Sequence, residues 1–175
     1  MAIRPTQASY SNLGTAYFNR GRFAEAGRTF EEAVKLAETN YEIWGNLADA
    51  YYWAPGQRAL AAGAYAKAIA LGLPQLKVNP RNAALLVDMA NYQAMVGRRK
   101  ESIEFLQRAL QIAPRDPVVQ FRAAMVHNQF GEAERALDLL ERARAVGFPI
   151  TIVRDTPNFG NLWRYPRFQN LLRGQ

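Results

Sequence analysis

The sequence predicts an all-α solenoid built from repeated helix-turn-helix units. Side chains of similar size recur at a spacing of 34 residues, and within each unit the apolar residues follow the spacing of one helix face. The length of 175 residues suits one short repeat array and leaves no room for a separate catalytic domain. We therefore expect residues 1–175 to form a single domain.

The repeat is visible in two separate registers. A pattern of aromatic, Leu, small residue and aromatic at residues 10–17 returns at residues 44–51. A pattern of Gly, Leu and Ala at residues 97–109 returns at residues 131–143. Two independent pairs that share one period indicate a true internal repeat.

Within a unit the spacing is helical. Tyr10, Leu13, Gly14 and Tyr17 fall at i, i+3, i+4 and i+7, on one face of a helix, and a similar pattern follows the break at Gly21. A small residue on this face lets the neighbouring helix approach closely. Each unit is thus predicted to be a helix, a turn and a second helix.

Capping signals set the boundaries of four units and a tail. Asn40, Asn82 and Asp116 are expected N-caps, and Pro117 fits the first position of a helix. The second unit is longer than the others, and Gly72 and Pro74 predict a break near its end. The expected segments are 7–40, 41–82, 83–116, 117–148 and a capping segment, 149–175.

The order of aromatic, Leu, Gly or Ala, Tyr, then Ala, aromatic, Ala and finally Pro resembles the tetratricopeptide-repeat (TPR) family over residues 7–148. This resemblance implies a right-handed superhelical solenoid with a short helical C-terminal cap, whose concave groove is lined by the first helix of each repeat. Units three and four depart from the pattern, because Leu86, Gln93, Gln120 and His127 stand at its aromatic positions.

The tail adds a narrower resemblance. Residues 159–172 are similar to the ending of TPR arrays in bacterial serine/threonine kinases, adenylate cyclases and CadC-like regulators, although Tyr165 replaces the usual Asp. Its apolar residues are expected to cover the open face of the last repeat. The resemblance implies a bacterial signalling or regulatory protein. The opening residues 3–8 resemble a junction after a preceding repeat, so we expect a fragment of a longer chain.

The resemblance also implies the function, a protein-binding scaffold or adaptor that holds a peptide or protein in its groove. Asn side chains suit a peptide backbone, and aromatic side chains and Met95 would supply apolar anchors. The alternative that Tyr52 and Trp53 pack against the next helix stays open. The expected groove residues are Asn12, Thr15, Phe18, Asn19, Asn46, Asp49, Tyr52, Trp53, Asn91, Met95, Arg122 and Asn128.

An enzyme is not expected. His127 is the single histidine and lies on an inward repeat position without a triad partner in sequence. The chain has no cysteine, no cluster of metal ligands and no Gly-rich phosphate loop, so we expect no catalytic residues, metal, cofactor or small-molecule substrate.

Two other binding functions are alternatives to protein binding. The net charge of +7 comes from 22 basic against 15 acidic residues, and arginines lie in the turns and tail beside aromatic residues, as in Arg98, Arg99 and Arg164. These could contact nucleic acid, but the groove offers no continuous basic stripe. Alternatively, the aromatic tail could pair between copies to form a homo-oligomer.

Residues 1–12 lack the apolar core of a secretory signal, and no apolar run is long enough to span a bilayer. We therefore expect a cytoplasmic location, with a periplasmic domain of a larger membrane protein as the open alternative.

Overall fold

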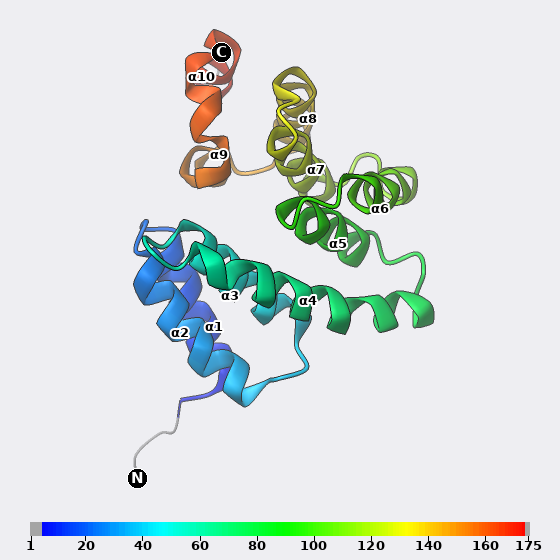
Figure 1. Ribbon diagram of the computed structural model, residues 1–175. Coiled ribbons are helices and arrows are strands. Elements are labelled where there is room, and N and C mark those ends of the chain that lie inside the picture. The colour runs from blue at the N-terminus through cyan, green and yellow to red at the C-terminus, as the bar shows by residue number, and fades with distance from the viewer. Residues whose placement is uncertain (1–4, 174–175) are drawn as a thin grey trace. The chain divides into compact units, whose positions relative to one another are not determined.

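The computed structural model describes residues 5–173 and consists of helices joined by short turns (Figure 1). The predicted all-α class is confirmed, since the described residues contain no strand. Part of the expected junction at residues 3–8 lies outside the described residues. The helices are α1 (Gln7–Phe18), α2 (Phe23–Leu36), α3 (Tyr41–Trp53), α4 (Arg58–Val78), α5 (Ala83–Met95), α6 (Arg99–Ile112), α7 (Pro117–Gln129), α8 (Ala133–Ala145), α9 (Ile150–Asp155), the 3₁₀ helix η1 (Pro157–Arg164) and α10 (Pro166–Arg173).

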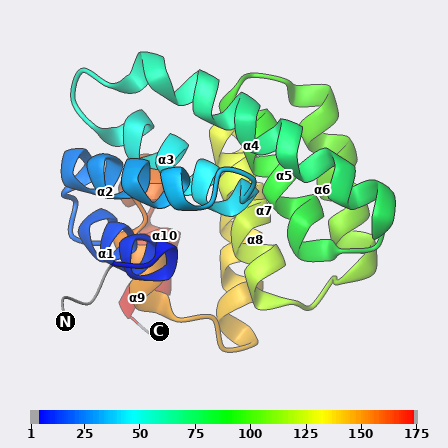
Figure 2. The same cartoon turned by 90° about the horizontal axis from the view of Figure 1, so that it is seen from below.

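Consecutive helices pair into hairpins, as the repeat predicted. α1 packs on α2, α5 on α6 and α7 on α8, and Figure 2 shows the last two pairs from a second side. Glycines with positive φ lie in the turn of each of these hairpins, at Gly21, Gly97 and Gly131. Glycine adopts this left-handed conformation without a steric penalty, so the chain reverses there within a few residues.

The predicted N-caps are confirmed. The Asn40 side chain accepts hydrogen bonds from the amides of Glu42 and Ile43, and Asn82 accepts one from Leu85 at 3.1 Å. Asp116 accepts from the two amides that follow Pro117, both at 2.9 Å. Each cap satisfies amides that have no partner inside the helix, which is why α3, α5 and α7 begin where they were expected to begin.

The expected break near Gly72 and Pro74 is wrong, because α4 runs through both residues to Val78. Pro74 has no backbone N–H to donate to the Ala70 carbonyl one turn earlier. Both residues lie on the exposed side of the helix, so this carbonyl can accept a hydrogen bond from water instead. Gly72 and Leu76, one turn apart, are both buried, and this burial favours continuing the helix past the proline.

The chain divides into two compact units, residues 1–74 and 75–175, with the boundary inside α4 directly after Pro74. In the first unit, α2 packs on α3 and the core includes Phe30, Ile43 and Leu47. In the second unit, α7 packs on both α5 and α6. The expected single domain of residues 1–175 remains a prediction, and the two units are described separately below.

Candidate functional site

The first unit carries eight of the twelve expected groove residues, on α1 and α3. Asn12 and Thr15 are exposed on α1, and Asn19, directly after its end, is exposed as well. The Thr15 hydroxyl donates to the Ser11 carbonyl of its own helix at 3.0 Å. The remaining five residues of this set are half-buried, namely Phe18, Asn46, Asp49, Tyr52 and Trp53.

Aromatic side chains from three helices meet beside these positions. Phe18 at the end of α1 contacts Phe23 at the start of α2, with ring centroids 5.1 Å apart. Phe23 lies 6.3 Å from Trp53, which in turn lies 5.2 Å from Tyr52 at the end of α3. All four rings are half-buried, so they form a continuous apolar surface that we call the aromatic cluster.

Trp53 therefore packs against α2, the helix that precedes α3 in the chain. The sequence had left open whether Trp53 lines a binding surface or packs against the next helix. Its ring contacts Phe23 and Tyr52, and its side chain is only half-buried, so part of it is accessible to solvent. Half-exposed aromatic side chains of this kind supply much of the energy at binding surfaces.

Arg58 adds a positive charge to the aromatic cluster. Its guanidinium lies over the Tyr52 ring, 4.1 Å from the centroid, and donates a hydrogen bond to the Tyr52 hydroxyl. Arg58 is exposed and forms no ion pair with another described residue. The guanidinium is therefore held in place by an aromatic ring while it remains available to a carboxylate from outside the chain.

Phe23 and Arg58 were not among the expected site residues. Each is the first residue of the second helix in its hairpin, α2 or α4. The first residue of a helix that follows a tight turn lies beside the end of the preceding helix. This position in the sequence could have identified both residues as part of the site.

Asp49 has a structural partner. It accepts a hydrogen bond from the hydroxyl of Tyr65, which is buried on α4. Asp49 therefore joins α3 to α4, whereas its role on the groove stays a prediction.

In the second unit, the expected residues of α5 and α7 are less accessible. Asn91 is 2% exposed and Met95 is half-buried. Arg122 forms an ion pair with Asp88 at 2.6 Å, across the packed helices α5 and α7. The one arginine expected on the groove is thus compensated by a nearly buried carboxylate.

The face of α7 around Asn128 is covered by the tail of the same chain. The Asn128 amide donates to the Asn158 carbonyl at 2.6 Å and to the Asn161 side chain at 2.8 Å. The Asn161 amide donates back to Asn128 at 3.0 Å. Phe121 lies about two turns before Asn128 on α7, and its ring centroid is 5.8 Å from that of Phe159 in η1. The expected binding position in repeat four is therefore filled by residues 157–164.

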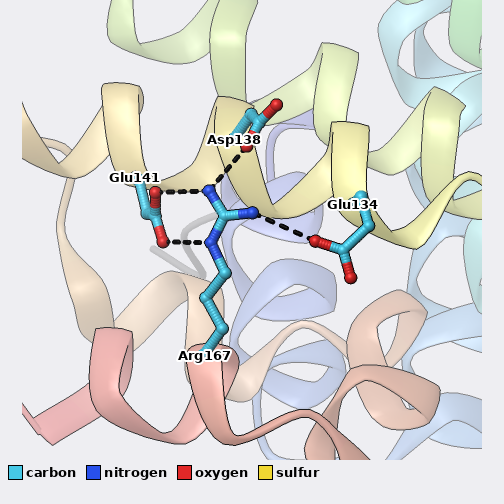
Figure 3. A network of polar contacts seen from close by, with 4 residues as sticks. All are labelled: Glu134, Asp138, Glu141 and Arg167. Atoms are coloured by element: carbon cyan, nitrogen blue, oxygen red, sulfur yellow. Dashed lines mark hydrogen bonds and ion pairs between the residues drawn. The ribbon is translucent and has the colours of Figure 1, made fainter.

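A second contact fastens the tail to α8. Arg167 of α10 points at three carboxylates on one side of α8, as Figure 3 shows. Its guanidinium binds Glu141 at 2.6 Å, Asp138 at 2.5 Å and Glu134 at 3.1 Å. Hydrogen bonds to Glu141 and Asp138 raise the pKa of Arg167 above its usual value. Arg167 is therefore used for contacts within the chain.

The turn arginine Arg99 and His127 meet at one glutamate. Glu132 binds the His127 ring at 2.6 Å and Arg135 at 3.1 Å, and also pairs with Arg99. Burial alone would raise the pKa of Glu132, but the hydrogen bonds from His127, Arg99 and Arg135 outweigh it and lower the pKa. His127 is therefore a hydrogen-bonded residue that links α7 to the start of α8.

Residues 5–173 contain no group of three or more His, Cys, Asp or Glu side chains placed to hold a metal ion. None of their helices is both long enough and apolar enough to cross a membrane.

Comparison with known proteins finds a family model and similar folds. The model of the tetratricopeptide repeat matches residues 7–40, the α1–α2 hairpin. No curated protein matches the chain. Among solved structures, the nearly identical TPR-like repeats assigned to a kinesin light chain of Podosopora anserina are 20% identical, with a TM-score of 0.52 over 95% of this chain and 93% of that chain. This likeness supports the fold alone.

Two other solved structures are similar at lower scores. MamA is 17% identical, with a TM-score of 0.49 over 93% of this chain and 89% of that chain. YrrB, a TPR protein with an unusual peptide-binding site, is 14% identical, with a TM-score of 0.47 over 94% of this chain and 82% of that chain.

Proposed function

We propose that this chain, whose residues 7–40 match the model of the tetratricopeptide repeat, is a protein-binding module that holds a peptide segment of a partner on the face of α1 and α3. The observation that carries the proposal is the aromatic cluster of Phe18, Phe23, Tyr52 and Trp53. Its four rings touch in series yet none is fully buried.

The chemistry of this face favours a particular kind of peptide. The aromatic cluster takes an apolar side chain, because burying apolar area there removes it from water. The exposed amides of Asn12 and Asn19 can both donate to and accept from a peptide backbone. Arg58 favours a carboxylate close to the apolar anchor. The proposed ligand is therefore a segment with an aromatic or aliphatic residue near an Asp or Glu.

The test is to pan a random peptide display library over the full chain and to measure enriched peptides by fluorescence anisotropy. Trp53→Ala should lower the affinity for an enriched peptide by at least about tenfold, since a central aromatic anchor contributes about 2 kcal/mol or more to the binding free energy. Trp163→Ala is the matched control, because Trp163 is 47% exposed and lies in η1. Equal binding by wild type and Trp53→Ala would contradict the proposed site.

The role of Arg58 is tested with a charge reversal. Arg58→Glu should weaken peptides that carry an acidic residue, whereas Arg28→Glu, an exposed arginine of α2, should leave their affinity nearly unchanged. A single-stranded oligonucleotide is the counter-probe. If it binds and the peptides do not, with an affinity that falls steeply as salt rises, the module binds nucleic acid instead.

The wider context is also a proposal. The likeness of residues 159–172 to the tails of bacterial signalling proteins supports a role as the interaction module of a bacterial signalling or regulatory protein, located in the cytoplasm. Identification of a longer natural chain with a kinase, cyclase or DNA-binding region would support this context. A natural chain that carries only repeats would contradict it.

A further inference from the structure

A groove of about 340 Å³ runs between α6 and α8, the second helices of repeats three and four. All the residues that line it belong to the second compact unit. Its volume is at the lower end of the range for ligand sites, so it can hold a few apolar side chains of a larger partner.

The floor of the groove is apolar. Ile103, Leu106 and Leu110 of α6 lie at i, i+3 and i+7 and so form one stripe along the helix, and Leu139 of α8 faces them across the groove. Leu106 and Leu139 are buried, whereas Ile103 and Leu110 are only half-buried. The stripe on α6 is therefore only partly covered by the rest of the chain.

The rim of the groove carries two arginines of α8. Arg142 is exposed and forms no ion pair with any described residue. Arg135 has a side chain 70% exposed, with a single bond to Glu132 at 3.1 Å. The one acidic residue of the rim, Asp138, is already paired with Arg167 at 2.5 Å. Two guanidiniums thus border an apolar floor, and the one carboxylate of the lining shares Arg167 with Glu134 and Glu141.

We infer that this groove is a docking surface for an acidic amphipathic helix of a partner protein. The apolar floor accepts the apolar stripe of such a helix, and the arginine rim accepts carboxylates beside that stripe. The occupant therefore carries apolar residues at i, i+3 or i+4, and i+7, with an Asp or Glu at two positions one heptad apart.

The spacing of the rim favours a helix over an extended peptide. Arg135 and Arg142 are seven residues apart on α8, which is about 10 Å along the helix axis. Residues seven apart in a docked helix lie on one face at that same distance. An extended strand covers about 10 Å in three residues, and residues three apart in a strand point to opposite faces. Only the helix brings both carboxylates to the rim.

This surface uses none of the residues in the proposed peptide site on α1 and α3, so the inference does not depend on the proposed function. Its loss would leave that site intact, and the reverse also holds. The two surfaces also differ in the ligand that they favour. A short segment with one aromatic or aliphatic anchor suits the aromatic cluster, whereas a helix of several turns suits the groove.

The experiment uses the full chain, isotope-labelled for NMR, and a synthetic peptide of about 18 residues with leucines along one face and two glutamates one heptad apart. Addition of the peptide should shift the amide signals of Ile103, Leu110 and Arg142, and the titration gives the dissociation constant. Arg142→Glu should raise the dissociation constant of the peptide at least about tenfold. The matched control Arg115→Glu, an exposed arginine after α6, should change it by less than about twofold.

Three outcomes would overturn the inference. A peptide with lysines in place of the glutamates could bind as tightly, which would remove the role of the arginine rim. The shifted signals could lie outside α6 and α8, which would place the contact elsewhere. Laurate could shift these signals while the acidic peptide does not, which would make the groove a site for aliphatic carboxylates and not for a protein helix.

Discussion

The first helices of repeats two and four show how the same repeat position acquires different roles. Tyr52 on α3 and Asn128 on α7 both lie eleven residues after the start of their helices. Tyr52 belongs to the half-exposed aromatic cluster, whereas Asn128 is 8% exposed and bonded to the tail. The repeat pattern fixes where a side chain lies on its helix, but the segments packed around that helix decide whether it can meet a partner.

The largest effect is expected where the tail fills the face of α7. Phe159→Ala should lower the free energy of unfolding by about 3–5 kcal/mol, because Phe159 is 1% exposed and packs on Phe121 and Phe168. Urea denaturation measures the change, and Trp163→Ala is the control from the same 3₁₀ helix. A loss below about 1 kcal/mol would mean that the tail is not a fixed part of repeat four.

A second substitution tests the packing beneath the open face of α1. Gly14→Ala should cost about 1–3 kcal/mol, because an added Cβ would lie 2.7 Å from the Phe30 ring, which is buried and cannot easily move. Gly63→Ala in α4 is the control, since its Cβ would meet no atom within 4 Å. That change should raise stability by up to about 1 kcal/mol, because alanine favours a helix more than glycine does. Thermal unfolding of the two variants should shift in opposite directions.

A third substitution separates the polar contact of the tail from its apolar contact. Asn128→Ala removes three hydrogen bonds between α7 and η1 and should cost about 1–2 kcal/mol. Hydrogen exchange of residues 157–164 should become faster, whereas exchange in α3 should not change. Unchanged exchange in η1 would show that Phe159 and Leu162 alone hold the tail on α7.

The smallest effect concerns Tyr51 on α3, whose hydroxyl donates to Glu31 at 2.8 Å. Burial and this hydrogen bond raise the pKa of Tyr51 from 10.0 to about 12. The native state then keeps the proton after the unfolded state has lost it, so stability is present below pH 10 and falls as the pH rises towards 12. Tyr51→Phe should cost about 1 kcal/mol at neutral pH and should flatten this alkaline decline. Denaturation at several alkaline pH values would detect it, and equal slopes in both proteins would contradict the assignment.

Much of the fold could be predicted because its determinants are local. The caps Asn40, Asn82 and Asp116 act on amides two or three residues away, so their effect is visible in the sequence. The helix through Pro74 could not be predicted in this way. Its continuation depends on burial at Gly72 and Leu76 and on solvent at Ala70, which are properties of the folded chain.

The candidate site was predictable only in part. Phe18, Tyr52 and Trp53 were expected from the repeat register, and the structure brings them together around Phe23, a residue of the second helix that the register of first helices does not include. The covering of Asn128 depends on a partner 33 residues later, Asn161. No local sequence feature of Asn128 or Asn161 predicts that the two side chains meet. Only the packing of the tail in the structure shows the pair.

The contacts of the tail also limit where a further repeat could be inserted into the chain. Repeat arrays grow by duplication of a unit, and a new unit needs the free face of the preceding repeat. Here η1 and α10 already occupy α7 and α8 through Asn128 and Arg167. A fifth repeat inserted after residue 148 would separate these partners, whereas one inserted before Pro117 would keep them together. α7, α8 and the tail therefore form one packing unit, and a repeat added on the N-terminal side of α7 would leave its contacts intact.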